Sequence, residues 1–311
     1  MSPAHARGGA AALLRDAVFG EPPEHLHPTV WMGRAISAFE KRALRLKTPE
    51  ARRRAGGVLA LALPGLAFLS TTAALNTAPR GFRWVLGAAL TSTALSMRGL
   101  GEAAEAVERE LRAGRLEGAR ERVGEFVGRD TGGLSEAEVC RAAVESVAEN
   151  ASDGVMAPML YGLLFGAPGA LAYKAVNTLD SMVGYRKGPY EELGRASARL
   201  DDLANLVPSR ATALAAAALS GRPATTLLTA RRYGPLTSSP NAGWAEAAFA
   251  GALGVRLGGP NIYGGVTREG PVLGEGRLPV PQDVGRAVGL MRRCCALLAL
   301  VAFLAGEAHR G

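Results

Sequence analysis

Two long runs without a charged residue constrain this chain most. Ala55–Pro79 contains 25 residues and Gly154–Tyr173 contains 20, and a helix needs roughly 20 apolar residues to cross the hydrocarbon of a bilayer. We therefore expect at least two membrane-spanning helices. Shorter uncharged stretches begin at Trp84, Ala211 and Cys294. They could cross only if flanking arginines reach the interface, so the number of crossings stays open.

The composition favours helices throughout the chain. Hydrophobic residues make up 48% and aromatic residues only 5%, and alternating runs of β-branched residues are almost absent. We therefore predict an all-α, polytopic integral membrane protein with a charged cytoplasmic helical insertion. It would form a single domain over residues 1–311, divided into a membrane hairpin (56–100), a charged helical connector (101–140) and an active-site core (141–265).

The distribution of charge predicts orientation and partners. Basic residues crowd the chain before Ala55, whereas only Arg80 and Arg83 follow Pro79 closely, so the positive-inside tendency places the N-terminal region in the cytoplasm. The first 15 residues lack the apolar core of a signal peptide. A net charge of +8 favours anionic partners such as lipid headgroups or nucleotides. No basic patch interleaved with aromatic residues or zinc-finger spacing is present, so we expect no nucleic-acid partner.

Three carboxylates precede the second uncharged run. In a helix Glu145 and Glu149 lie one turn apart, and Asp153 continues the row where Ser152–Gly154 is expected to end the turn. Such a row repels itself unless a cation lies among its members. A divalent metal or a cationic amine and a simple solvated face are equally good interpretations of the spacing.

A polar stripe follows the same run. Lys174, Asn177 and Asp180 recur at steps of three or four residues, so a helix would present ammonium, amide and carboxylate groups on one face. Lys174 could neutralise phosphate oxygens while Asp180 holds magnesium, although a Lys–Asp pair could also merely close the end of a helix.

An Asp-Asp-x-x-Asn motif lies further along. Asp201, Asp202 and Asn205, with Arg199 before them, resemble the oxygen-rich spacing that holds magnesium and diphosphate in some helical enzymes. By itself the motif is weak. Phosphate-loop, HExxH and GxSxG signatures are all missing from the sequence, so any ATP site must be unorthodox.

Other candidates lie in turns. His27 precedes Pro28 and could be a base or could hydrogen-bond its own turn. Asn241 stands where a helix is expected to start, so an N-cap explains part of its presence. The Gly/Pro-rich stretch around Asn261 and Tyr263 could wrap a ligand.

Five long blocks in a fixed order resemble the cobalamin-biosynthesis family CobD/CbiB, the adenosylcobinamide-phosphate synthases. The resemblance runs from about Asp16 to the end and is weakest over Gly56–Cys140 and after Gly265. Small departures are Glu21, Ala151 and Ala245, where the family commonly has Asp, Thr and Pro. The matching blocks are D-x3-G-E-P-P-x3-H-P-x4-G (Asp16–Gly33), ENASDG (Glu149–Gly154), YKAVNTLDSMVGYR (Tyr173–Arg186), ASARLDDLANLVPSR (Ala196–Arg210) and SPNAGWAEAAFAGALGVRLGGPNIYGG (Ser239–Gly265).

The resemblance implies a multi-pass enzyme of the bacterial inner membrane whose active site faces the cytoplasm. Such an enzyme uses ATP and Mg²⁺ to join a corrinoid, adenosylcobyric acid, to an amino alcohol, (R)-1-amino-2-propanol or its O-phosphate. The product is an amide, adenosylcobinamide or its phosphate. Whether the amine is phosphorylated, and whether subunits form a homo-oligomer, stays open.

This chemistry suggests a role for each polar candidate. Carboxylates would hold magnesium or the amine, cationic groups would bind phosphate oxygens, and side-chain amides would bind the rim of the corrin. The expected catalytic residues are Glu145, Glu149, Asp153, His27, Lys174 and Asp180, with His27 or Glu145 as the base; the expected substrate-binding residues are Asn150, Asn177, Arg186, Arg199, Asn205, Asn241, Asn261 and Tyr263; the expected magnesium ligands are Asp180, Asp201 and Asp202.

Two other classes of function stay open. A polytopic magnesium-dependent prenyl or phosphoalcohol transferase would usually show two Asp-rich motifs, whereas only Asp201–Asn205 comes close. A non-enzymatic membrane sensor paralogue would need neither the polar stripe after Lys174 nor the Asn-rich loops. Their presence favours catalysis.

Overall fold

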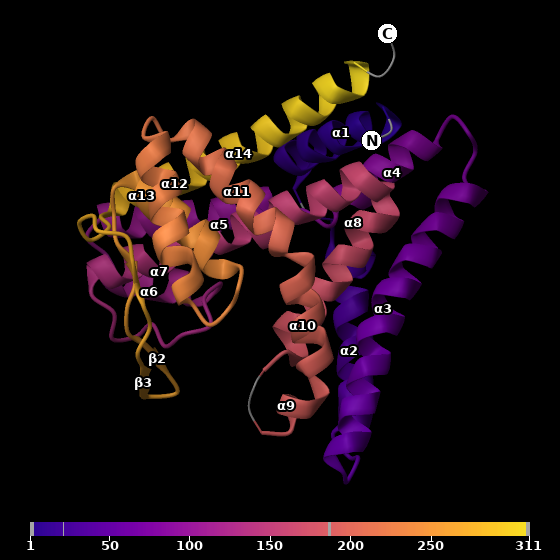
Figure 1. The fold of residues 1–311 in the computed structure, drawn as a ribbon, viewed down its shortest axis with the longest axis horizontal. Coiled ribbons are helices and arrows are strands. Elements are labelled where there is room, and N and C mark those ends of the chain that lie inside the picture. Colours follow the sequence, from indigo (N-terminus) through magenta and orange to yellow (C-terminus); the bar gives the residue numbers. More distant parts are fainter. Residues whose placement is uncertain (1–2, 21, 186–187, 309–311) are drawn as a thin grey trace. The chain divides into compact units, whose positions relative to one another are not determined.

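The computed structural model describes residues 3–20, 22–185 and 188–308, and this part of the chain is almost entirely helical (Figure 1). Its contacts divide it into two compact units. The first comprises Met1–Ser96, Ala157–Asn205 and Ala299–Gly311, and the second Met97–Met156 and Leu206–Leu298. We describe each unit by itself.

The described residues of the first unit form helices and no strands. These helices are α1 (Pro3–Phe19), a 3₁₀ turn (Glu24–Leu26), α2 (Pro28–Ala43), α3 (Pro49–Thr77), α4 (Arg83–Ser92), α8 (Ala157–Val183), α9 (Tyr190–Leu193) and α10 (Arg195–Ala204).

The second unit adds short strands to its helices. Its elements are α5 (Met97–Arg112), α6 (Leu116–Gly124), α7 (Glu136–Asn150), a π-helical segment (Ala151–Met156), α11 (Leu206–Leu219), α12 (Pro223–Tyr233), a 3₁₀ turn (Gly234–Leu236), α13 (Ala242–Leu253), β1 (Leu257–Gly258), β2 (Asn261–Tyr263), β3 (Val266–Arg268) and β4 (Val272–Leu273); α14 (Pro281–Ala308) begins in this unit and ends in the first.

Three helical stretches are long and apolar enough to cross a membrane, which confirms the polytopic membrane class. They are Pro49–Thr77, Glu136–Val183 and Pro281–Leu304. The first two contain the long uncharged runs. For the third, the sequence left open whether the short uncharged run from Cys294 crosses; the helix extends back to Pro281 and so reaches spanning length. Only 17% of the most apolar window of α3 is buried, as expected for a helix whose side chains contact lipid.

The second uncharged run does not form one straight helix. Gly166 has φ +70°, a conformation that residues with a Cβ adopt only at a cost, and Pro168 follows it without a backbone N–H. This interruption kinks α8 within its apolar part.

The core of the first unit lies between α2, α3 and α8. Ile36, Leu59, Leu179 and Val183 form a buried cluster. Helix α3 also approaches α9 closely, since a Cβ on Gly56 would lie 1.9 Å from the backbone oxygen of Leu193.

Helices α5 and α6 lie in the stretch 101–140 that was expected to be a charged connector, and they pack against each other as a hairpin. Its outer side carries ion pairs one turn apart, such as Arg112–Glu108 at 2.6 Å. Its inner side is buried, with Ala104 and Val107 fully covered, and α5 packs against α7. One face of the hairpin therefore belongs to the core of the second unit.

The Gly/Pro-rich stretch after α13 forms two small antiparallel sheets, one pairing β1 with β4 and the other pairing β2 with β3. The β2–β3 turn contains Gly264 and Gly265, both at positive φ, as a two-residue hairpin turn requires. The Gly/Pro-rich stretch is therefore more ordered than the open loop that its composition suggested.

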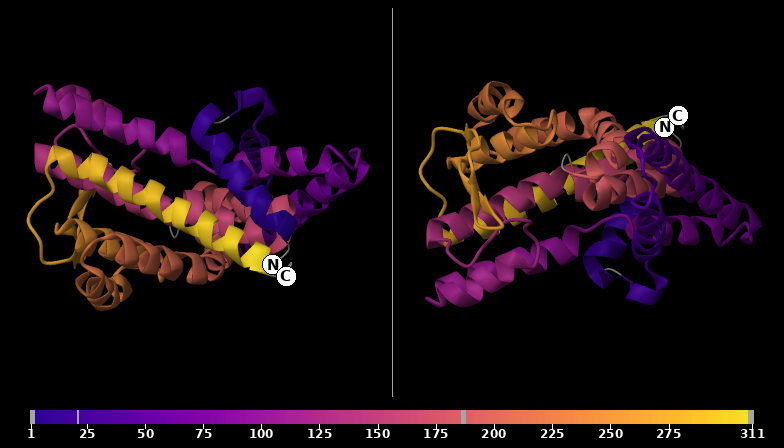
Figure 2. Two further views of the ribbon diagram at one scale, coloured as in Figure 1. Left: turned by 90° about the horizontal axis from the view of Figure 1, so that it is seen from above. Right: turned by 90° about the horizontal axis from the view of Figure 1, so that it is seen from below.

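Helices α12 and α13 lie side by side in the same unit (Figures 1 and 2).

Candidate functional site

The second unit contains a polar cavity of about 680 Å³. Its walls come from the loop before α7, one face of α7, the start of α13 and the strands after it. Five of the residues predicted from the sequence line this cavity: Glu145, Glu149, Asn150, Asn261 and Tyr263.

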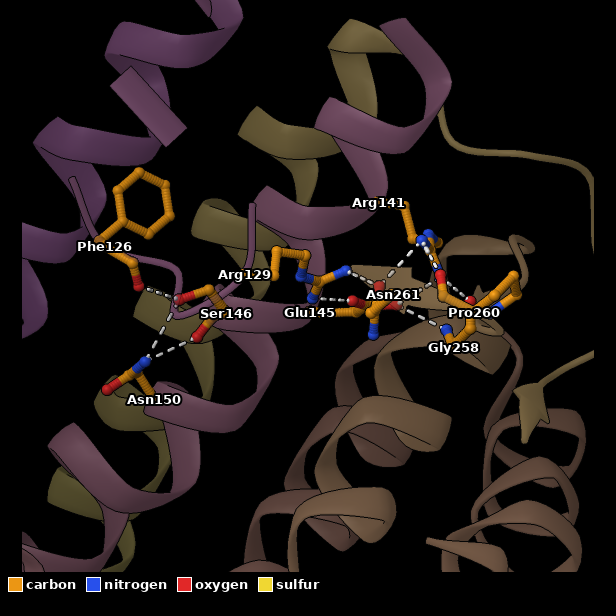
Figure 3. A network of polar contacts seen from close by, with 9 residues as sticks. All are labelled: Phe126, Arg129, Arg141, Glu145, Ser146, Asn150, Gly258, Pro260 and Asn261. Carbon is orange, nitrogen blue, oxygen red and sulfur yellow. Dashed lines mark hydrogen bonds and ion pairs between the residues drawn. The ribbon is translucent and has the colours of Figure 1, made fainter. Parts of the chain in front are cut away.

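Glu145 is held from two sides. Arg129 forms an ion pair with its Oε2, and the backbone N–H of Gly258 donates to its Oε1 at 2.6 Å (Figure 3). The Glu145 and Arg129 side chains are only 7% and 10% exposed. Both carboxylate oxygens are therefore engaged, and they tie α7 to the strand region.

Two arginines position Asn261. Its Oδ1 accepts from Nη1 of Arg129 at 2.6 Å and from Nη2 of Arg141 at 3.0 Å. Arg141 also donates to the backbone oxygens of Pro260, at 2.9 Å, and of Gly258 (Figure 3). The sequence interpretation missed both arginines, which stand apart from the conspicuous polar blocks.

The expected row of carboxylates is altered by the backbone. The helix does not end at Ser152–Gly154, as expected from the sequence, but continues as a π-helical segment from Ala151 to Met156. A π turn is wider than an α turn, so Asp153 does not continue the α-helical spacing of Glu145 and Glu149. Such π segments occur frequently at functional sites.

Glu246 completes a group of four carboxylates. Burial raises its pKa well above 4.5, and the charges of Glu149, Glu145 and Asp153 raise it further, against a smaller opposing effect of Arg129. The sequence showed Glu246 only as a residue in the first turns of a helix. Its approach to α7 depends on the packing of α13 against that helix.

The remaining predicted residues of this cavity make local contacts. Asn150 Nδ2 donates to the backbone oxygen of Ser146 at 2.9 Å (Figure 3). The guanidinium of Arg268 lies 4.9 Å from the centre of the Tyr263 ring, a cation–π contact.

Asn241 occupies the N-cap position of α13, but its side chain does not cap the helix. Its Oδ1 instead accepts from Arg210 Nη1 at 2.6 Å and from Ser209 Oγ at 3.3 Å. Ser239 Oγ accepts from the backbone N–H of Ala242 at 3.3 Å. The N-cap interpretation of the Asn241 side chain was therefore wrong.

A second polar group lies in the first unit, between α8 and α10. Tyr173 donates to Asn205 Oδ1 at 2.7 Å, and Asn205 Nδ2 donates to Asp201 Oδ2 at 3.0 Å. Asp201 Oδ1 is buried and accepts no hydrogen bond from the described residues. Burial raises the pKa of Asp201 to about 7, and the charge of Asp180 adds to the shift, which exceeds the opposing effect of the amides of Asn205 and Asn177.

The other predicted residues of the first unit differ in burial and in their hydrogen-bond partners. Lys174 Nζ donates to Ser96 Oγ at 3.4 Å. Arg199 is exposed, and Asp202 is half-buried. His27 is buried, and its Nδ1 accepts from the backbone N–H of Thr29 at 3.2 Å, so it caps α2. Arg186 lies outside the described residues.

The predicted site residues therefore divide between the two units. The second unit holds Glu145, Glu149, Asn150, Asp153, Asn241, Asn261 and Tyr263; the first holds His27, Lys174, Asn177, Asp180, Arg199, Asp201, Asp202 and Asn205. Across the described part of the chain, no three His, Cys, Asp or Glu side chains are grouped so that they could hold a metal ion by themselves.

Comparison with known proteins decides the family. The family profile described as "CobD/Cbib protein" matches residues 9–291. The chain belongs to the CobD/Cbib family. Its relatives include "Cobalamin biosynthesis protein CobD" of Geobacter metallireducens, which is 47% identical over 305 residues (94% of this chain and 93% of the relative).

Two further relatives of this CobD/Cbib chain are similar in extent. A protein named CobD from Klebsiella pneumoniae subsp. pneumoniae is 43% identical over 90% of this chain and 91% of its own length. "Cobalamin biosynthesis protein CbiB" of Salmonella typhi is 40% identical, with 95% of each chain covered. No solved structure matches. Both polar groups lie within the matched CobD/Cbib region.

Proposed function

We propose that this protein acts in cobalamin biosynthesis as an ATP-dependent amide ligase. It joins adenosylcobyric acid to (R)-1-amino-2-propanol or to its O-phosphate, giving adenosylcobinamide or its phosphate. Membership of the CobD/Cbib family and the printed names of the relatives support the pathway. The carboxylate-lined cavity of the second unit supports the chemistry.

That cavity is the observation on which the proposal depends. The charges of Glu145, Glu149 and Asp153 act on Glu246, and Arg129 pairs with Glu145. Negative charges gathered beside an open cavity of about 680 Å³ favour a cationic ligand. The ammonium group of an amino alcohol meets this requirement and is small enough for the cavity.

The ligation must first activate a carboxylate. A carboxylate oxygen of the corrinoid attacks the γ-phosphorus of ATP, ADP leaves, and a mixed anhydride with phosphate results. The amine nitrogen then attacks the carbonyl carbon, and inorganic phosphate leaves as the amide bond forms. Lys174 and Arg199, with Arg186, are assigned to phosphate oxygens, because negative charge develops there during transfer.

The attacking amine must lose a proton before it can form the bond. Glu246 suits this step better than Glu145 or His27, because a raised pKa makes a carboxylate a stronger base. Both oxygens of Glu145 are engaged, and Nδ1 of His27 already accepts a backbone hydrogen bond. We therefore assign the proton to Glu246, while Glu149 and Asp153 hold the ammonium group.

The polar group of the first unit has the side chains that a magnesium ion would need. Mg²⁺ usually binds one or two protein carboxylates and completes its shell with water and phosphate, so a group of three is not needed. Asp201 Oδ1 is buried without a hydrogen bond from the described residues, and Asp180 is close enough to raise its pKa. Asp180 and Asp201, with Asp202 beside them, would hold the ion, which neutralises phosphate charge when bound.

The amide groups suit a corrin rim that carries many amides. Asn150, Asn177, Asn205, Asn241 and Asn261 are assigned to it, since each side-chain amide can both donate and accept. Tyr263 is assigned to the same substrate because its ring lies exposed at the cavity wall. We place the protein in the bacterial inner membrane with the site on the cytoplasmic side, following the charge asymmetry around α3.

The test is amide formation by the detergent-solubilised full chain. Adenosylcobyric acid, ATP and Mg²⁺ are supplied with aminopropanol or aminopropanol phosphate in parallel reactions, and the products are read by mass. Product with one amine identifies both the reaction and the form of the substrate. Absence of product with either amine, from folded protein, contradicts the ligase assignment; turnover that depends on a lipid diphosphate identifies a transferase instead.

A further inference from the structure

Helix α2 carries a groove of about 700 Å³ that the proposed ligase reaction does not use. Four of its lining residues are basic, namely Arg34, Lys41, Arg42 and Arg45. Ser37 and Met182 also line it, the latter from α8. The groove lies entirely within the first unit.

The periodicity of α2 separates this basic face from the core. Met32, Ile36 and Ala43 are buried, and at 100° per residue they lie on the side of the helix opposite Arg34 and Lys41. Ile36 packs in the cluster that also contains Leu59 of α3. The basic side chains are therefore directed away from the protein interior by the same pattern that buries the apolar ones.

The four cations have no ion-pair or side-chain hydrogen-bond partner among the described residues, whereas nearby Arg53 pairs with Glu192 at 2.6 Å. The one carboxylate on the same helix, Glu40, accepts a hydrogen bond from Tyr190. The groove therefore concentrates positive charge that only an external anion can balance.

The groove also runs along a membrane-spanning helix. Arg45 lies only four residues before α3 begins at Pro49. Arg34 is two residues from Ile36, which packs in the same cluster as Leu59, inside the uncharged part of α3. Arg34, Lys41 and Arg42 thus extend over about 12 Å of α2, and with Arg45 just beyond its end the cations reach from the start of the span to the level of its apolar residues. Long basic side chains at that level reach a headgroup by snorkelling.

We propose that this groove binds the headgroup of an anionic phospholipid. The phosphate would lie against Lys41, Arg42 and Arg45, which are nearest the start of the span. Arg34 would lie deeper in the bilayer. Clusters of basic residues next to a spanning helix recognise anionic lipids through this charge complementarity. The position of Arg34 at the level of the apolar residues of α3 favours a lipid over a soluble phosphate, which would need only the outer cations.

Native mass spectrometry of the full chain in detergent tests this inference, with phosphatidylglycerol titrated against phosphatidylcholine. The triple variant Lys41→Gln/Arg42→Gln/Arg45→Gln should retain phosphatidylglycerol about 100-fold less well than the parent protein, since each basic residue near a lipid surface contributes about fivefold. Arg34→Gln alone should weaken retention about fivefold. Neither change should alter phosphatidylcholine binding or the thermal unfolding temperature.

The matched control removes three exposed cations elsewhere, Arg109→Gln/Arg231→Gln/Arg256→Gln, and should retain phosphatidylglycerol like the parent protein. Equal loss in the control and the groove variant would overturn the proposal, because net charge alone would explain it. Inorganic tripolyphosphate separates the two sources of phosphate. If it binds lipid-free protein through the same cations and displaces phosphatidylglycerol at equal concentration, the groove is a soluble polyphosphate site and the lipid assignment is wrong.

Discussion

Arg129 and Glu145 form a buried ion pair across one wall of the polar cavity, and the same carboxylate accepts the backbone N–H of Gly258. Glu145 therefore connects α7 to a strand 113 residues later in the chain. A buried carboxylate in such a position orders the cavity walls. Its loss should therefore lower the stability of the fold, whether or not it also takes part in the reaction.

Removing one member of this pair should destabilise the protein strongly. We expect Arg129→Met to lower the free energy of unfolding by about 3–5 kcal/mol, because it removes the nearer counter-charge of a buried carboxylate and leaves only Arg141, whose Nη1 lies 3.9 Å from Glu145 Oε1. The double variant Arg129→Met/Glu145→Leu should recover much of that loss. Chemical unfolding in detergent measures both, and Arg115→Met, at the exposed Arg115–Glu110 pair, serves as a control expected to change little. Equal stability of Arg129→Met and the parent protein would contradict the pairing.

Glu246 should make the protein less stable as pH rises. Its pKa in the folded state is raised above 4.5 by burial and by neighbouring carboxylates, so the folded protein holds this proton more tightly than the unfolded chain does. The free energy of unfolding should therefore fall as pH rises from about 4.5 through the raised pKa. Glu246→Gln should remove this component from unfolding curves recorded across pH, with Glu269→Gln as the matched control on the same cavity. A curve unchanged by Glu246→Gln would exclude the raised pKa.

Asp201 should produce a second pH effect, reversed by magnesium. Its pKa of about 7 in the folded state exceeds 3.8, so without metal the free energy of unfolding should fall by up to about 4 kcal/mol as pH rises between these values. Asp201→Asn should flatten that interval. Magnesium should also reduce the fall, because a bound cation favours the ionised carboxylate. Unfolding curves in EDTA and in magnesium measure this, and identical wild-type curves in both would argue against a metal at Asp201.

Asp180→Asn and Asp202→Asn should abolish amide product while the protein remains folded. Each change keeps the size of the side chain but removes a charge that we assign to magnesium. Product mass in the ligase assay, with circular dichroism as the folding control, measures the effect. Full turnover in either variant would remove the role assigned to that residue.

Neighbouring glycines in α3 should respond oppositely to the same substitution. Gly56→Ala should destabilise the protein, since its Cβ would lie 1.9 Å from the backbone oxygen of Leu193, whereas Gly57 has no atom within 4 Å of its added Cβ. Gly57→Ala should be neutral or should stabilise by up to about 1 kcal/mol through helix propensity. Thermal unfolding of the two variants tests the packing of α3 against α9, and similar unfolding temperatures would contradict it.

Much of the architecture followed from local patterns. Uncharged runs near 20 residues predicted spanning helices in both places where they occur, because the hydrophobic thickness of a bilayer sets a length that a sequence displays directly. Whether the third stretch reaches spanning length stayed open in the sequence, because its start, at Pro281, carries charges that interrupt the uncharged run but not the helix.

The sequence by itself determined which polar groups this chain possesses and that most of them flank apolar helices. Only the tertiary structure decided which of them meet. Glu246 joins Glu145 and Glu149 because α13 packs against α7, about 100 residues away in sequence, and Arg129 pairs with Glu145 because a loop folds back on α7. Hydropathy and periodicity are properties of neighbouring residues, whereas burial and charge interactions depend on distance in space.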